Sequence, residues 1–333
     1  MKPDLVVFVI TLALTICNAQ EPEVYSKEFQ NALQYGAKSK LTLNVSVEKG
    51  SPVSNATARV YFNMGSAIGK TVTGETDESG VFATEGLCAD YADFSLEKNG
   101  FYKSVGKYVF QSLDPERLKD GCWLPWNPTI PVMLREIRNP IPMYIMKVHG
   151  KFPNGETVGF DCEKGQFLAP YGEGENADFN ITMEVEGLPY KHMKHLIHLG
   201  SPDPDGGFLM SELNQSSAFR SDYYASEFGY KANLSATWVY DVRQGVTGSV
   251  LYGNDEYLMF KSRIKRDEKG TIVSANYGKI YGNFVYGRGD DEMKTVSVGF
   301  LYYFNQTPND RNLEFDGKNN LFFPQNKFSP YDP

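Results

Sequence analysis

Three of the four histidines in the sequence lie close together, at His192, His195 and His198. On a β-strand His192 and His198 would share one face and His195 would point to the other, because successive side chains alternate. Neutral imidazoles on one face bind Zn²⁺ or Cu²⁺ when a carboxylate such as Asp203 or Asp205 joins them. The spacing lacks the glutamate that zinc hydrolases place beside the first histidine as a general base. His192, His198 and Asp203 are therefore a candidate metal site, and exposed or structural histidines are the alternative interpretation.

Two tryptophans form a second candidate site. Trp123 and Trp126 flank Leu124 and Pro125, and the proline ring stiffens this loop. Exposed aromatic rings on such a loop could stack on sugar rings, which predicts ligand binding by both tryptophans. The competing interpretation is burial of the two rings in a core or between domains, where large aromatic side chains contribute most to packing.

Carboxylates offer a further chemistry. The chain has 41 acidic residues, and a pair of them flanking a glycosidic bond would suffice for glycoside hydrolysis. No local sequence singles out such a pair, so the catalytic residues of this alternative are unassigned. A hydrolase with its site in the second half of the chain, or at the domain interface around Pro140, is the main rival to a binding protein.

The cysteines indicate at most one internal disulfide in the mature chain. Removal of an N-terminal signal would leave Cys88, Cys122 and Cys162. In an oxidising compartment we expect Cys88 to pair with Cys122, because both fall in the same predicted domain. Cys162 would then be a buried free thiol. The alternative is that all three are small buried hydrophobic residues.

The first 19 residues have the layout of a secretory signal peptide. Lys2 precedes an apolar run at residues 5–16, and small residues then lead to Ala19. As a helix the run would rise roughly 18 Å, which is short of the ~30 Å hydrocarbon core of a membrane. Lipid attachment at Cys17 is an alternative, although the bulky Ile16 departs from the lipoprotein pattern. We expect a secreted, periplasmic or cell-envelope protein with no transmembrane segment after cleavage.

Composition favours many short strands. Aromatic residues make up 14% of the chain, and 31 glycines and 18 prolines supply turn formers. The net charge of −8 argues against a protein that coats nucleic acid or anionic lipid. A length of 333 residues suggests two domains of roughly 150 residues each.

The first half of the chain has the pattern of an antiparallel sandwich. After a short N-terminal segment at 20–37, in which residues 23–35 can form a helix, Leu41, Leu43 and Val45 alternate with polar residues. Six or seven strands separated by turns are predicted between residues 38 and 138. The predicted strands are 41–48, 56–62, 70–76, 81–83, 92–98, 102–110 and 129–134.

The turns of this half follow a recognisable order. Gly50-Ser51-Pro52-Val53 comes first, Thr76-Asp77-Glu78-Ser79-Gly80 follows, and Lys98-Asn99-Gly100-Phe101 closes the series. In this order, residues 38–136 resemble the carboxypeptidase regulatory-like, prealbumin-like (transthyretin-like) domain. The resemblance implies a seven-stranded Greek-key sandwich. It also implies a non-catalytic domain that serves as a folding adaptor, a spacer or a glycan-binding module.

The second half is predicted to be another antiparallel β domain, at residues 139–304. The stiff connector Asn139-Pro140-Ile141-Pro142 marks its beginning. Residues 159–179 resemble a module of secreted bacterial proteins that carries no established function. Residues 305–333 form a tail rich in proline and asparagine, part of which is expected to dock through Phe315 and residues 321–323. The predicted strands are 143–148, 157–162, 178–186, 195–199, 238–242, 247–252, 257–265, 271–281 and 294–304.

The sequence therefore predicts an all-β protein with two antiparallel sandwich-like domains and no cofactor. The preferred function is a secreted, non-catalytic binding or scaffolding protein of the bacterial envelope, with polysaccharide as the preferred ligand. Envelope proteins are the other expected class of partner, and nucleic acid is not expected. The alternatives are the hydrolase described above and a purely structural envelope protein.

Overall fold

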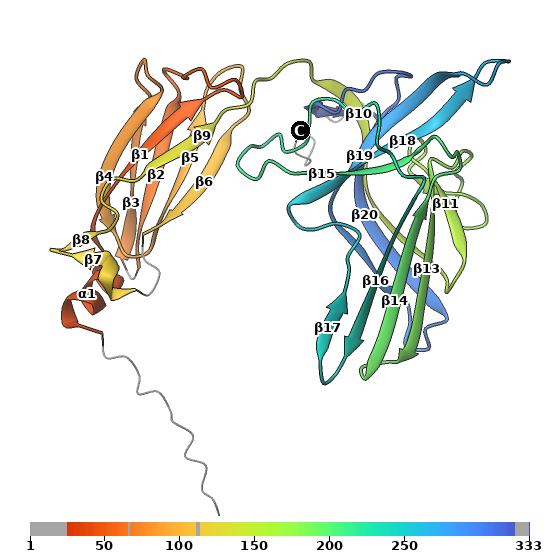
Figure 1. The fold of residues 1–333 in the computed structure, drawn as a ribbon, viewed down its shortest axis with the longest axis horizontal. Coiled ribbons are helices and arrows are strands. Elements are labelled where there is room, and N and C mark those ends of the chain that lie inside the picture. The colour runs from red at the N-terminus through yellow and green to blue at the C-terminus, as the bar shows by residue number, and fades with distance from the viewer. Residues whose placement is uncertain (1–24, 66, 111–113, 324–332) are drawn as a thin grey trace, which may run out of the picture.

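The computed structural model describes residues 25–65, 67–110, 114–323 and 333. These residues form two antiparallel β-sandwiches connected in sequence, with little helix, and the predicted all-β class is confirmed (Figure 1). The predicted signal peptide, Cys17 and residues 324–332 of the predicted tail lie outside the described residues. No helix in the described part of the chain is long and apolar enough to cross a membrane.

Helix α1 (Lys27–Tyr35) precedes the first sandwich and covers one end of it. The helix begins after Ser26, whose side chain accepts a hydrogen bond of 3.2 Å from the backbone nitrogen of Phe29. Phe29 and Ala32 are buried on its inner face, as predicted from their spacing.

Seven strands of five or more residues build the first sandwich. One sheet has β1 at its centre, with β4 antiparallel and β9 parallel to it, and the short β8 and β7 extend it at one end. The second sheet has the order β3-β2-β5-β6. The predicted alternation in β1 is confirmed, because Leu41, Leu43 and Val45 are buried between the sheets. The bounds are Ala37–Ser46 (β1), Thr57–Met64 (β2), Ala67–Glu75 (β3), Val81–Cys88 (β4), Tyr91–Glu97 (β5), Ser104–Val109 (β6), Leu118–Lys119 (β7), Cys122–Trp123 (β8) and Thr129–Met133 (β9).

The second sandwich consists of two six-stranded sheets. Their strand orders are β15-β18-β19-β20-β10-β21 and β12-β11-β13-β14-β16-β17, and all neighbours are antiparallel except β10 and β21. The bounds are Ile141–Pro153 (β10), Thr157–Asp161 (β11), Gln166–Phe167 (β12), Phe179–Leu188 (β13), His192–Gly200 (β14), Gly207–Glu212 (β15), Asn233–Asp241 (β16), Gly245–Gly248 (β17), Glu256–Arg266 (β18), Ile272–Arg288 (β19), Thr295–Asn305 (β20) and Phe315–Asn320 (β21).

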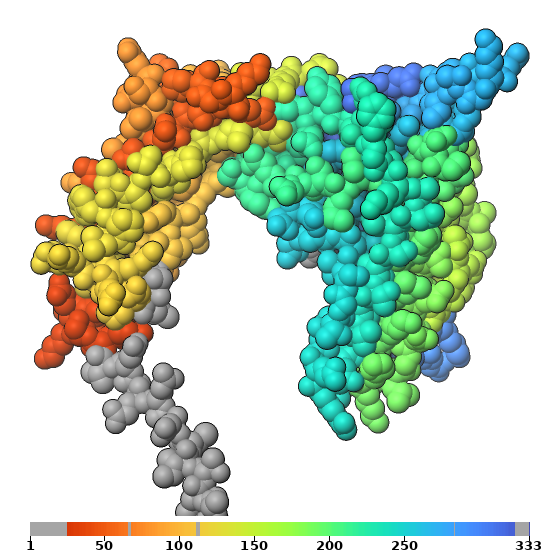
Figure 2. All heavy atoms as spheres, viewed as in Figure 1, coloured from red at the N-terminus to blue at the C-terminus, as the bar shows by residue number. Residues whose placement is uncertain are grey.

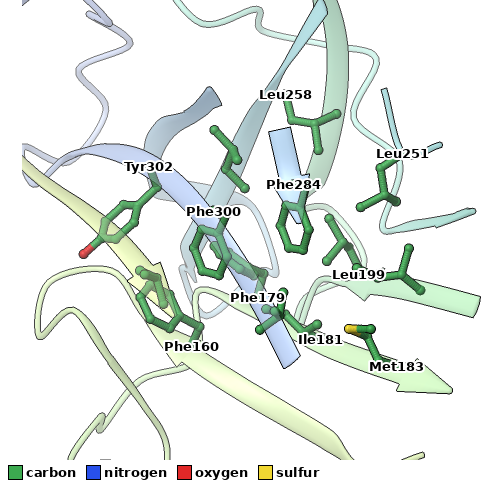
Figure 3. Close-up of a cluster of buried hydrophobic side chains, with 14 of the residues drawn as sticks. Phe160, Phe179, Ile181, Met183, Leu199, Leu251, Leu258, Phe284, Phe300 and Tyr302 are labelled. Atoms are coloured by element: carbon green, nitrogen blue, oxygen red, sulfur yellow. The ribbon is translucent and has the colours of Figure 1, made fainter. Parts of the chain in front are cut away.

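The core between these two sheets is rich in phenylalanine (Figure 3). The ring centroids of Phe160 and Phe300 lie 5.1 Å apart at a near-perpendicular angle, and Phe300 stacks on Phe284 at 5.1 Å. A second cluster covers the opposite face of the β18–β20 sheet, under the loop of residues 213–232 and the segment 306–314. Consecutive residues of β20 such as Tyr302 and Tyr303 are therefore both buried, because both faces of this sheet are covered.

The segment after residue 304 is part of the second sandwich. β21 pairs in parallel with β10, with Phe315 opposite Ile141. Phe315 is completely buried, and the ring of Phe322 packs against Tyr144 at 4.9 Å. The expected docking of the tail is thus an added edge strand, which requires long-range pairing that a proline- and asparagine-rich sequence does not reveal.

The two sandwiches meet at one end, and Figure 2 shows an open space between them along the rest of their length. The rings of Tyr102, Phe219 and Tyr223 form a small apolar cluster at this junction. Two backbone hydrogen bonds join β6 and the residue before it to the 213–232 loop, from Val105 to Ser216 (2.7 Å) and from Ala218 to Lys103 (2.9 Å).

Buried charged groups complete the junction. The Glu314 carboxylate accepts hydrogen bonds from the Tyr102 hydroxyl (2.8 Å) and from the backbone nitrogens of Arg138 (2.8 Å) and Asn139 (2.7 Å). Arg135 of the first sandwich donates to the carbonyl oxygens of Phe219 (2.8 Å) and Ser221 (2.5 Å). These contacts hold the connector between the sandwiches in one conformation.

Candidate functional site

Trp123 is completely buried, so it cannot form part of an exposed platform. Its short strand β8 pairs with β1 and directs the indole under α1, where it meets Phe29 edge-on at 5.9 Å. The indole nitrogen donates a hydrogen bond of 2.6 Å to the carbonyl oxygen of Cys88. The predicted platform of two tryptophans is therefore wrong for Trp123, and the alternative of core burial is correct for this residue.

Trp126 has a different environment, because 44% of it is exposed. It lines a hollow of about 520 Å³ on the first sandwich, together with residues of β1, β2, β3 and β4. The lining also includes the exposed side chain of Leu87. Three exposed charged side chains also line the hollow, namely Lys38, Lys70 and Glu85.

The predicted metal ligands do not come together. His192 and His198 are six residues apart on β14, which places them roughly 20 Å apart along an extended strand. The His192 ring pairs with Asp241 at 3.2 Å, and Asp203 is held by the guanidinium of Arg266. Among the residues that the structure describes, no group of three His, Cys, Asp or Glu side chains could hold a metal ion. The predicted metal site is therefore wrong.

The predicted disulfide is also absent, since Cys88, Cys122 and Cys162 are all free. Cys88 lies on β4 and Cys122 on β8, and these strands pair with opposite edges of β1. Two strand spacings separate them by about 9.5 Å, which exceeds the ~7 Å limit for bridged Cα atoms. Burial raises the pKa of the Cys88 thiol to about 11, so this thiol is protonated and unreactive at neutral pH.

The buried carboxylates of the second sandwich are occupied by structural contacts. The Arg263 guanidinium lies 2.8 Å from Asp161 and 2.9 Å from Asp178. Asp178 also accepts hydrogen bonds from the backbone nitrogen of Cys162 and from the Ser262 hydroxyl. Carboxylates that are paired in this way stabilise the fold around β11 and β18, and they do not favour the hydrolase alternative.

A second hollow opens between the sheets of the second sandwich. It measures about 520 Å³ and lies between β16, β17 and the loop 249–254 on one side and β19 on the other. Leu251 and Phe284 form part of its lining and also belong to the phenylalanine-rich core (Figure 3). We call this hollow the β16–β19 cleft. Its main side chains are Trp238, Val246, Val250, Leu251, Phe284 and Tyr286.

His195 lies beside this cleft on the inner face of β14. Its ring stacks on Trp238 with a centroid distance of 3.6 Å and an interplanar angle of 8°, and the residue is 2% exposed. Neither ring nitrogen has a hydrogen-bond partner among the described residues, and the same holds for the buried hydroxyl of Tyr286. Burial and the nearby charge of Arg288 lower the pKa of His195 to about 4, so the ring is neutral at pH 7.

Sequence reasoning missed this cleft. It treated His195 as the histidine that points away from a metal site, and it predicted a strand at residues 247–252, most of which is a loop. One signal was present, because His195, Ile197 and Leu199 occupy alternate positions and therefore share the apolar face of a strand.

Comparisons with known proteins assign no family. No protein-family model and no curated protein match the sequence. Among solved structures, the match to 3-chlorocatechol 1,2-dioxygenase from Rhodococcus opacus 1CP has 9% identity and a TM-score of 0.26. It covers 31% of this chain and 62% of the dioxygenase chain, which is less than two thirds of the latter.

Two pilin structures match over more of the chain. The shaft pilin SpaA of Lactobacillus rhamnosus GG has 10% identity and a TM-score of 0.22 over 74% of this chain and 87% of the pilin. BcpA, the major pilin subunit of Bacillus cereus, has 8% identity and a TM-score of 0.22 over 81% of this chain and 89% of the pilin. At these TM-scores the matches carry no argument about function. The resemblance of the first domain to prealbumin-like domains stays a prediction.

Proposed function

We propose that this protein is a secreted, non-catalytic binding protein of the bacterial envelope and that its ligand is a polysaccharide. The single observation that carries the proposal is the half-exposed indole of Trp126 over a hollow of about 520 Å³. This volume falls in the range of roughly 300–1,000 Å³ that is typical of small-molecule sites.

The lining of this hollow suits a sugar. The indole face of Trp126 and the Leu87 side chain offer apolar surface for the C–H face of a pyranose ring. Lys38, Lys70 and Glu85 offer donors and acceptors for ring hydroxyls. One wall of the hollow comes from β1 and β4 and is held by the ladder between these strands, and the other sheet contributes Met64 of β2 and Lys70 of β3.

A scaffolding role is the second candidate, and the junction between the sandwiches supports it. Glu314 and Arg135 are at most 5% exposed and connect the two sandwiches through hydrogen bonds on both sides. Such a junction resists reorientation of the sandwiches, which is useful in a spacer between other envelope components.

The test is a glycan and cell-wall polymer array probed with the mature chain, residues 20–333. We expect specific binding that Trp126→Ala weakens about tenfold or more, equivalent to about 1.4 kcal/mol. Phe228→Ala is the matched control, because Phe228 is also an exposed aromatic residue and lies outside the hollow. Absence of binding by the unmodified chain, or equal binding by the Trp126→Ala variant, would contradict the proposal and favour scaffolding.

A further inference from the structure

The β16–β19 cleft combines an apolar lining with an opening to solvent. Val246, Val250 and Val285 line it, and each of these side chains is more than half exposed. Leu251 and Phe284 lie deeper and connect the cleft to the main core of the sandwich. An apolar molecule in the cleft would extend this core and remove the exposed valine side chains from water.

Buried polar groups that lack protein partners among the described residues lie next to the lining of the cleft. Tyr286 lines the cleft, and its buried hydroxyl has no hydrogen-bond partner within the described part of the chain. The His195 ring stacks behind Trp238, and both of its nitrogens also lack a hydrogen-bond partner among the described residues. Buried polar groups are nearly always paired in folded proteins, so unpaired ones beside a cavity point to a ligand that supplies the partner.

We propose that the β16–β19 cleft binds a single-chain lipid with an uncharged hydrogen-bonding head, such as a monoacylglycerol. The acyl chain lies against Val285, Leu251 and Phe284, and the head lies at the end of the cleft formed by Tyr286 and Trp238. Since the indole covers His195, the head reaches the imidazole only when the Trp238 ring turns aside.

The groups on this wall favour a neutral head over a carboxylate. A neutral imidazole has one N–H donor and one acceptor nitrogen, and the tyrosine hydroxyl can donate or accept, which matches hydroxyl and ester groups. Arg288, whose charge acts on His195, already forms an ion pair of 2.8 Å with Asp291 and stacks on the ring of Tyr190. A charged head would also lose its hydration without gaining a free counter-charge.

The site is on the second sandwich and is independent of Trp126, so failure of either proposal leaves the other intact. The experiment is calorimetric titration of the mature chain with monolauroylglycerol below its aggregation concentration. We expect one molecule to bind per chain, lauric acid to bind at least tenfold more weakly, and Trp126→Ala to leave the affinity unchanged.

Substitutions on one strand locate the site. Val285→Asp is expected to weaken binding at least tenfold, because it places a charge in the apolar lining. Val273→Asp is the matched control, since Val273 is also an exposed valine of β19 and lies outside the cleft. His195→Phe keeps a ring for stacking on Trp238 and is expected to reduce the preference for monolauroylglycerol over lauric acid.

Three outcomes would overturn the proposal. The first is absence of monolauroylglycerol binding, and the second is equal weakening by Val273→Asp and Val285→Asp. The third is a dimer in sedimentation experiments that Val285→Asp dissociates, because a second copy of the chain would then be the occupant of the cleft.

Discussion

The junction and the β16–β19 cleft both bury polar groups, and they differ in whether these groups have partners. At the junction the Glu314 carboxylate accepts three hydrogen bonds, and Arg135 donates to two carbonyl oxygens and to Glu48. Beside the cleft, His195 is as deeply buried, yet neither of its ring nitrogens has a hydrogen-bond partner in the described residues.

The buried amine of Lys279, next to the junction, also has hydrogen-bond partners. Its amine is buried, and it contacts the Ser221 hydroxyl (3.0 Å), the Tyr281 hydroxyl (3.2 Å) and the Leu313 carbonyl oxygen (2.8 Å). Burial, together with the charge of Arg135, lowers the pKa of this amine well below its usual value. The comparison teaches that burial alone does not identify a functional site, because paired groups stabilise a fold while unpaired groups weaken it.

The largest expected effect comes from breaking the junction. Glu314→Ala removes the acceptor of the buried Tyr102 hydroxyl and of two part-buried backbone N–H groups, so we expect the free energy of unfolding to fall by about 3–5 kcal/mol. Urea denaturation would measure this loss. Glu97→Ala is the control, because Glu97 pairs with Lys103 on the surface and should contribute less than about 1 kcal/mol. Similar losses in the two variants would contradict the structural role of the junction.

The pH dependence of stability should separate His195 from the paired groups. Its pKa is 6.5 in an unfolded chain and about 4 in the fold. As pH falls from about 7 to 4, the unfolded state gains a proton that the folded state does not, so stability decreases, and below about pH 4 this contribution levels off. The lowered pKa of His195 therefore costs the fold at most about 3–4 kcal/mol at low pH.

Thermal unfolding of the unmodified chain and of His195→Phe between pH 4 and pH 7.5 would measure the contribution of His195 to the pH dependence of stability. Groups such as His192, which pairs with Asp241, are present in both proteins and cancel in the difference. We expect the variant to gain stability over the unmodified chain as the pH is lowered. A difference that stays constant with pH would contradict the lowered pKa, because it would mean that His195 takes up its proton at the same pH in the folded and unfolded states.

The smallest expected effect compares one substitution at two tyrosines. Tyr102→Phe removes a hydroxyl that donates to Glu314, and it should cost about 1.5–3 kcal/mol. Tyr286→Phe removes a buried hydroxyl that has no partner among the residues described, so it should be neutral or stabilising by up to about 1 kcal/mol. Urea denaturation of both variants would measure the difference, and losses of equal size would contradict the comparison.

Features that depend on neighbouring residues could be predicted from the sequence. The alternation of Leu41, Leu43 and Val45 predicted a strand with one buried face, and these three side chains are buried. The helix found at Lys27–Tyr35 was expected from the shared face of Phe29 and Ala32. Both predictions succeed because the periods of strands and helices are local properties of the backbone.

The candidate sites could not be predicted in the same way. Trp123 and Trp126 are three residues apart and look equivalent in sequence, yet packing under α1 buries the first and leaves the second exposed. The Cys88–Cys122 prediction failed because β1 lies between the two strands that carry these residues. Both outcomes depend on strand order, which residues far apart in the chain determine together.

The sequence by itself determined the all-β class and the positions of most strands, because side-chain alternation and turn residues act over a few neighbouring positions. The tertiary structure decided which polar groups have partners. Glu314 meets Tyr102 across 212 positions of sequence, whereas the His195 ring stacks on Trp238 and its nitrogens find no hydrogen-bond partner in the part of the chain described. Residues that are distant in sequence therefore decide whether a buried polar group has a hydrogen-bond partner within the fold.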